Sequence, residues 1–231
     1  MLDAGTGSGA STAALASEIH RTGGSGRIVS VDLDPDCFQL ARERLGDKEY
    51  LVEFLESDLA RLPFQDDTFD LVVSAGTLCA VNSQSLRAVA AVQEFFRVLK
   101  PGGICAVKDE YPMIASSEAR FQVQAKRWRL YRALCDLTGR YHYNEFLPSD
   151  LKRVMEIVGF DCTSWSREPG GPLRPGVVEE GVAILKEMAE EVDNAAMRQV
   201  FLSEVESIQA AYRQIGGDFP DQFVLHSFKP E

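Results

Sequence analysis

The 231-residue sequence has few cysteines and few histidines, and the five cysteines are scattered along the chain. None of them forms a C-x-x-C pair. Disulfide frameworks and cysteine-based metal sites need paired or regularly spaced cysteines. We therefore expect reduced thiols that are mostly buried as small apolar side chains, a cytoplasmic location and no metal site.

The sequence also lacks a long apolar segment and an excess of basic residues. Its longest nearly apolar run, Leu71 to Val81, is far shorter than the ~20 residues of a transmembrane helix, so no membrane span is expected. Lys and Arg number 24 against 35 Asp and Glu, which gives a formal net charge of −11. Because a negative protein repels phosphate backbones, we do not expect nucleic-acid binding, although residues 126–129 carry a short basic group.

The first half alternates short apolar runs with helical segments. This pattern predicts βαβ units and a parallel sheet with helices on both faces. A very short first strand precedes residue 5. The other predicted strands are 27–31, 50–55, 69–74 and 104–108, and the predicted helices are 11–21, 34–45 and a segment from Ser83 or Ser85 to Leu99.

The second half is mainly helical. Helical spacing covers 116–137, 148–159 and 177–215, and strands are predicted at 160–165 and 222–228. A break near Asp193 and Asn194 divides the long segment 177–215 into two helices. We expect one domain over 1–231, with a cofactor-binding half (1–110), a helical cap (111–147) and a helical insertion (177–215). The insertion is expected to pack on its own domain, with a dimer contact as the alternative.

The strongest local signal is the segment from Asp3 to Gly9, DAGTGSG, here called the glycine turn. Glycines allow a sharp turn and the close approach of a ligand. The helix that follows presents free N–H groups to negative ligand groups. Asp32 ends the second predicted strand, where a carboxylate can accept hydrogen bonds from ribose hydroxyls. The same spacing fits a dinucleotide fingerprint, so the turn alone leaves the ligand open.

Three further segments follow in order, and together the five segments carry a family resemblance. The set LDAGTGSG, VDLDP, SDLARLPF, FDLVVS and RVLKPGG resembles class I S-adenosylmethionine-dependent methyltransferases, in particular the ubiquinone/menaquinone-biosynthesis-like group. The resemblance covers residues 1–110 and continues more loosely to residue 160. It implies a Rossmann-like α/β fold with a seven-stranded, mostly parallel sheet and an antiparallel last strand. The family usually has a short hairpin between strands six and seven, where we expect the helical insertion.

The resemblance also implies a set of residues that bind S-adenosyl-L-methionine. The glycine turn would face the methionine part, Asp32 would hold the ribose, and Asp58 would accept from the adenine amino group. Leu33 would pack beside the adenine, and the segment after the fourth strand would line the sulfonium. The full cofactor-binding set is Asp3, Gly5, Thr6, Gly7, Asp32, Leu33, Asp58, Leu59 and Ala75.

The resemblance implies transfer of a methyl group to a small or medium-sized organic acceptor by in-line displacement. Such a transfer depends mainly on alignment, and it needs a general base only if the acceptor carries a proton of high pKa. The candidate catalytic residues are His142, Tyr141 and Glu110. For His142 the alternative is an ordinary loop residue. The aromatic residues between 121 and 146 predict an apolar cap over the acceptor.

Two other functions stay open from the sequence. One is a methyltransferase fold that binds the cofactor without catalysis. The other is an NAD(P)-dependent oxidoreductase, which is disfavoured because none of the six tyrosines is followed four residues later by lysine. The oligomeric state, monomer or homodimer, is also open.

Overall fold

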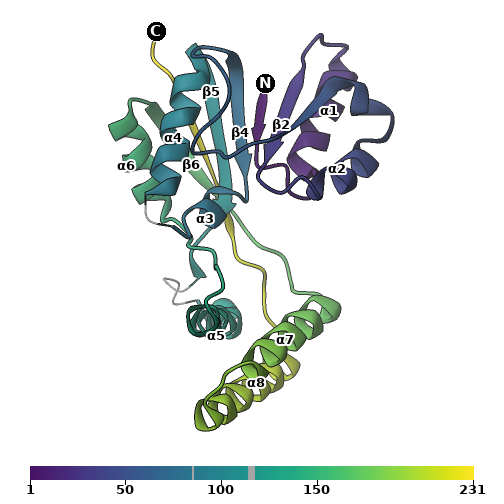
Figure 1. Cartoon of the computed structure of the whole chain (residues 1–231), viewed down its shortest axis with the longest axis vertical. Coiled ribbons are helices and arrows are strands. Elements are labelled where there is room, and N and C mark those ends of the chain that lie inside the picture. The colour runs from purple at the N-terminus through teal and green to yellow at the C-terminus, as the bar shows by residue number, and fades with distance from the viewer. Residues whose placement is uncertain (85, 114–117) are drawn as a thin grey trace. The chain divides into compact units, whose positions relative to one another are not determined.

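The computed structural model describes residues 1–84, 86–113 and 118–231 and two compact units (Figure 1). Ser85 and Ser116, which were predicted to cap one helix and begin another, lie outside the described residues, as does the side chain of Cys162. Unit 1 comprises Met1–Asp109, Glu145–Ser166 and Phe223–Glu231, and unit 2 comprises Glu110–Asn144 and Arg167–Gln222.

Unit 1 is built on a seven-stranded sheet. Its order is β3-β2-β1-β4-β5-β7-β6, in which β1 to β5 run parallel and β7 runs antiparallel between β5 and β6. This confirms the predicted fold class. The strands are β1 (Leu2–Ala4), β2 (Ile28–Asp32), β3 (Val52–Glu56), β4 (Phe69–Ala75), β5 (Leu99–Glu110), β6 (Asp161–Glu168) and β7 (Gln222–Phe228).

Helices cover both faces of this sheet. One apolar cluster joins the sheet to α4 and α6, and a second joins Ile28 and Leu51 to Ile19 of α1. Successive residues of a strand point to opposite faces, so β2 serves both clusters. The helices of unit 1 are α1 (Ala10–Thr22), α2 (Cys37–Leu45), α3 (Leu78–Val81), α4 (Arg87–Val98) and α6 (Pro148–Val158), with a 3₁₀ helix at Gly46–Leu51.

Unit 1 differs from the prediction in two places. Strand β5 begins at Leu99 instead of residue 104, because Gly102 N–H donates to Lys229 O at 2.8 Å and Lys229 N–H donates to Gly103 O at 3.1 Å. Pairing with the end of the chain thus extends the strand through a Pro-Gly-Gly signal that is typical of a turn. Helix α3 was not predicted, since four residues are too few to show periodicity.

Unit 2 is helical. Its helices are α5 (Gln122–Thr138), α7 (Pro175–Glu190) and α8 (Ala195–Ile215), with a 3₁₀ helix at Ala119–Phe121. Helices α7 and α8 lie side by side and share an apolar core with α5 (Figure 1). Asn194 separates α7 from α8, and its Oδ1 accepts a hydrogen bond from Met197 N–H at 3.0 Å, which is a helix N-cap. The predicted helical insertion and its break are therefore confirmed.

Asp221 ties together the two chain segments of unit 2. Its carboxylate is 3% exposed. Oδ2 accepts from Arg120 Nη2 at 2.9 Å and from Arg167 Nε at 2.7 Å, while Oδ1 accepts from Gly170 N–H at 2.8 Å. These bonds keep the pKa of Asp221 below its usual value although burial opposes them. The sequence offered no sign of this arrangement, because Arg120 and Asp221 are far apart in the chain.

Candidate functional site

The glycine turn lies at the carboxyl end of β1 and is fixed to β2. The N–H groups of Gly5 and Thr6 both donate to Val31 O at 2.9 Å. Gly5 has φ +99°, and a Cβ atom there would lie 2.1 Å from Thr77 Oγ1. Only glycine fits this position, and the turn therefore packs directly against the segment that follows β4.

Asp3, the first residue of this turn, has one carboxylate oxygen that accepts no hydrogen bond from the described residues. The residue is fully buried, and its Oδ2 accepts from Ser11, Thr12 and Ser30 at 3.0, 2.5 and 3.2 Å. Its Oδ1 is buried and has no hydrogen-bond partner among the described residues. Burial raises the pKa of Asp3 to about 6, partly offset by the three hydroxyl donors. An unpaired buried acceptor is costly unless a ligand donates to it, and a cationic amino group such as that of S-adenosylmethionine fits.

Asp32 continues the site at the end of β2. Its Oδ2 accepts from Gly7 N–H at 2.8 Å and its Oδ1 from Asp34 N–H at 3.1 Å, so the carboxylate holds the glycine turn in place. The side chain is half-buried, and each oxygen retains acceptor capacity for a ligand. The neighbouring Leu33 is 65% exposed, an apolar surface that a flat ring can cover.

Asp58 follows β3 and forms an ion pair that was not predicted. Its Oδ1 accepts from Ala60 N–H at 3.0 Å, and its Oδ2 accepts from Arg87 Nη2 at 2.5 Å. Burial opposes ionisation, but these donors hold the pKa of Asp58 below its usual value. Arg87 begins α4 and is thus a further residue at this edge. The next residue, Leu59, is buried in the apolar core of unit 1.

The segment after β4 completes the edge. Ala75 ends the strand, and the buried Ser74 Oγ has no hydrogen-bond partner among the described residues. The buried Asp109 Oδ2 accepts from Cys79 N–H at 2.9 Å and so fixes α3, another contact that the sequence did not reveal. The cofactor-set residues all lie at or just beyond the carboxyl ends of the adjacent strands β1 to β4. Open α/β sheets bind ligands at this edge.

The three catalytic candidates belong to unit 2. Glu110 is the last residue of β5 and is half-buried, whereas Tyr141 is 75% exposed. His142 Nε2 lies 3.1 Å from Asp136 Oδ1, and its Nδ1 lies 3.0 Å from Tyr143 O. Both partners accept, so only a ring with two N–H groups satisfies both bonds.

Three of the aromatic residues that were expected to form a cap stack on one another in unit 2. Trp128 stacks on Tyr131 with ring centroids 5.2 Å apart and on Tyr143 at 6.0 Å. Phe121 is buried beside Trp128, while Phe146 packs against the core of unit 1. The indole Nε1 of Trp128 is buried and has no hydrogen-bond partner among the described residues. Trp128 is 8% exposed and Tyr143 is 50% exposed, so Tyr143 carries much of the exposed surface of the stack.

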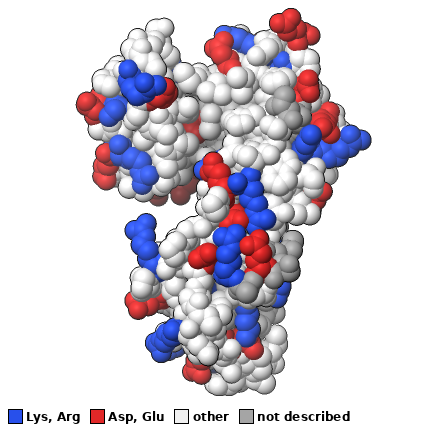
Figure 2. Space-filling view, turned by 180° about the vertical axis from the view of Figure 1, so that it is seen from behind, with Lys and Arg blue, Asp and Glu red and all other residues white. Residues whose placement is uncertain are grey.

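The short basic group at residues 126–129 includes a paired lysine. Lys126, in the one short basic group, pairs with Glu204 at 3.0 Å, and Figure 2 shows acidic and basic side chains interspersed on the visible face. Within residues 1–84, 86–113 and 118–231, no helix is long and apolar enough to cross a membrane. Nor does this part group three His, Cys, Asp or Glu side chains as metal ligands.

The raised pKa of Asp3 leads to a pH-dependent prediction. A ligand ammonium stabilises the ionised carboxylate, so we expect affinity for S-adenosylhomocysteine to rise with pH by at most about tenfold per unit up to pH 6, and then to level off. Titration calorimetry between pH 5 and 8 measures this. Asp3→Asn should bind more weakly and without this pH dependence; an unchanged profile in that variant would contradict the role of Asp3.

The raised pKa of Asp3 has the opposite consequence for the unliganded protein, whose stability falls as the pH rises. Folded Asp3 binds its proton more tightly than the unfolded chain does, because its pKa is about 6 instead of 3.8. The contribution of Asp3 to the free energy of unfolding is therefore full below pH 4 and is lost as the pH rises to about 6.

The chain is similar to known methyltransferases. Residues 2–107 match the family model described as a methyltransferase domain. The chain is 29% identical over 164 residues to a ubiquinone/menaquinone biosynthesis C-methyltransferase (UbiE) of Marinomonas sp. strain MWYL1, covering 64% of this chain and 62% of that protein. The protein of the same name from Idiomarina loihiensis is 27% identical, covering 74% and 70%. The chain thus spans less than two thirds of the first relative.

Solved structures share the fold at lower identity. A putative methyltransferase (BH2331) from Bacillus halodurans C-125 gives a TM-score of 0.63 at 18% identity, covering all of this chain and 92% of that one. The [4+2]-cyclase SpnF gives a TM-score of 0.60 at 20% identity, covering 99% and 73%. At these identities, the likeness shows the fold alone.

Proposed function

Since residues 2–107 belong to the methyltransferase domain family, and the chain is in its class I S-adenosylmethionine-dependent branch, we propose that it transfers a methyl group to a small or medium-sized organic acceptor. The observation that carries the proposal is the edge formed by the glycine turn, Asp3 and Asp32. There a buried carboxylate oxygen still needs a donor, and a second carboxylate faces the same turn.

The residues of unit 1 supply binding and orientation. S-adenosylmethionine, when bound, supplies a methyl group that is already activated on sulfur. Asp3 would hold the amino group of the methionine part, Asp32 the ribose and Asp58 the adenine, with Leu33 covering the ring. A cofactor fixed at these points has few orientations left, and alignment is what an in-line displacement requires.

The acceptor class is inferred from the relatives. The relatives are named ubiquinone/menaquinone biosynthesis C-methyltransferases. We therefore propose an electron-rich ring whose carbon atom receives the methyl group. His142 would take the ring proton, with Tyr141 and Glu110 as further candidates for this step.

We also propose a cytoplasmic monomer that does not bind nucleic acid. In the described part of the chain, no disulfide joins Cys37, Cys79, Cys105 and Cys135, which suits a reducing compartment. The buried apolar residues of α7 and α8 pack within unit 2, which favours a monomer over a homodimer. The net charge of −11 is unfavourable for phosphate backbones.

An acceptor panel tests the activity. The intact chain is incubated with S-adenosylmethionine and a set of phenols, quinols, amines and carboxylates, and the formation of S-adenosylhomocysteine is followed by chromatography. We expect turnover with ring acceptors, a lower kcat in His142→Asn, and a raised KM for the cofactor in Asp32→Ala. Binding of S-adenosylhomocysteine without turnover on any acceptor would favour the non-catalytic alternative, and an unaffected His142→Asn would remove the role of His142.

A further inference from the structure

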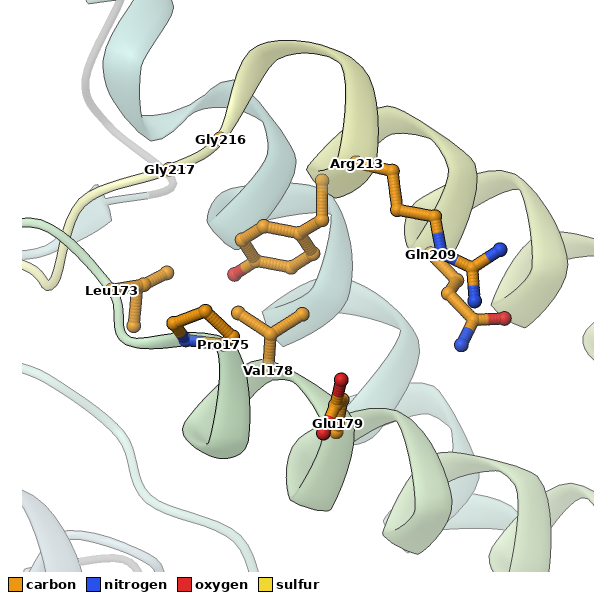
Figure 3. A pocket seen from close by; sticks show the side chains of 9 residues that line it. Leu173, Pro175, Val178, Glu179, Gln209, Arg213, Gly216 and Gly217 are labelled. Carbon is orange, nitrogen blue, oxygen red and sulfur yellow. The ribbon is translucent and has the colours of Figure 1, made fainter.

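Unit 2 contains a pocket that none of the cofactor or catalytic candidates lines. It lies between the start of α7 and the end of α8 and has a volume of about 290 Å³, at the lower end for small-molecule sites (Figure 3). Its apolar lining comes from Leu173, Pro175 and Val178 together with the ring of Tyr212, and Gly216 and Gly217 contribute backbone.

The pocket wall is well fixed. Tyr212 is 7% exposed, and its hydroxyl donates a hydrogen bond to the buried Gln124 of α5. Burial raises the pKa of Tyr212 to about 12, so this wall stays uncharged at neutral pH. The mouth is held by hydrogen bonds between the segments before α7 and after α8, including Leu173 N–H to Gly217 O at 2.9 Å.

Gly217 keeps this space open. A Cβ atom there would lie 2.7 Å from Tyr212 Cε1 and 3.3 Å from Leu173 Cδ1, so any larger residue would crowd two lining side chains. The pocket thus depends on a glycine at this close approach.

Three polar side chains gather on one side of the pocket. Figure 3 shows Glu179, Gln209 and Arg213 there, across from Leu173 and Pro175. Gln209 and Arg213 are four residues apart and so share one face of α8. In the described part of the chain, these three side chains have neither a hydrogen bond nor an ion pair, and Glu179 and Arg213 do not pair with each other.

One carboxylate and one guanidinium, both unpaired, thus border an apolar pocket of metabolite size. We propose that the pocket binds a small zwitterion with an apolar side chain, namely a free apolar α-amino acid. Its ammonium would pair with Glu179 and its carboxylate with Arg213, with Gln209 hydrogen-bonding between them. Its side chain would lie against Val178 and Tyr212. Charge-assisted hydrogen bonds of both signs select the zwitterion over a molecule with one charge.

A nuclear magnetic resonance titration of the intact ¹⁵N-labelled chain tests this without reference to methyl transfer. The probes are L-leucine and L-phenylalanine, with 3-phenylpropionate and phenethylamine as analogues that lack one charge each. We expect the amino acids to bind with dissociation constants on the order of 1 mM or tighter and to shift the amide signals of Gly216 and Gly217. Each analogue should bind about tenfold more weakly or not at all.

Variants locate the site. Arg213→Gln and Glu179→Gln should each weaken amino-acid binding about tenfold or more. Glu180→Gln and Arg129→Gln change the same charges at exposed positions outside the pocket, and both should bind as the unaltered chain does. The proposal is overturned if no amino acid binds at millimolar concentration, if an analogue binds equally well, or if the pocket variants behave like the controls.

Discussion

Replacing Asp32 with Ala lowers the affinity for S-adenosylhomocysteine by about 5- to 150-fold, which corresponds to roughly 1–3 kcal/mol. The variant loses the acceptor expected to hold the ribose hydroxyls, and it also releases Gly7 N–H, which Asp32 Oδ2 holds at 2.8 Å. The first loss acts on the bound state, and the second releases the turn that is expected to contact the cofactor, so the cofactor affinity falls while the buried core of unit 1 is untouched. Titration calorimetry of the intact chain measures the change.

Asp36→Ala is the matched control for this prediction. Asp36 is an exposed carboxylate in the same loop, and its side chain does not cap α2. The substitution removes the same charge without removing a contact to the glycine turn, so the affinity for S-adenosylhomocysteine should stay within about twofold of that of the unaltered chain. Equal losses in the two variants would mean that the effect is general electrostatics instead of a contact made by Asp32.

Replacing Asp221 with Ala destabilises unit 2 by about 2–4 kcal/mol. The substitution leaves the guanidinium groups of Arg120 and Arg167 and the N–H of Gly170 without their buried partner. Both arginines are about one-third exposed, so water recovers part of the loss. Hydrogen exchange measured by mass spectrometry should show faster exchange in α5, α7 and α8.

Acidification should have a related effect through Asp221. The pKa of Asp221 is lowered in the folded state, so its contribution to stability is present above the unfolded value of about 4 and is lost as the pH falls through the folded value.

Asp218→Ala serves as the control for the Asp221→Ala substitution, because Asp218 lies at the longer distance of 3.6 Å from Arg120. If the amide hydrogens of α5, α7 and α8 exchange at the same rate in both variants, the contacts of Asp221 do not stabilise unit 2.

Local signals in the sequence predicted most elements of the fold. The break between α7 and α8 could be placed because Asn194 is a strong capping residue between two runs of helical spacing. The start of β5 could not, because the pairing of Gly102 with Lys229 joins distant residues and outweighs a local turn signal. Helix α3 depends in the same way on the distant carboxylate of Asp109.

At the edge of the sheet where the cofactor is expected to bind, the residues that belong to the ordered sequence motifs could be predicted. The glycine turn and Asp32 stand at family-like distances, and the comparisons confirm the family resemblance that these motifs indicated. The partner of Asp58 was not predictable, since Arg87 reaches it from another helix. Likewise, nothing local in the sequence showed that both ring nitrogens of His142 would have acceptors as partners.

The central claim is that the glycine turn, Asp32 and Asp58 hold an adenosine-bearing sulfonium. Equilibrium titration of the intact chain with S-adenosylmethionine, S-adenosylhomocysteine and NAD⁺ tests it most directly. We predict saturable binding of the first two at one site, with no displacement by excess NAD⁺. Saturable binding of NAD⁺ together with no binding of either sulfur compound would contradict the account.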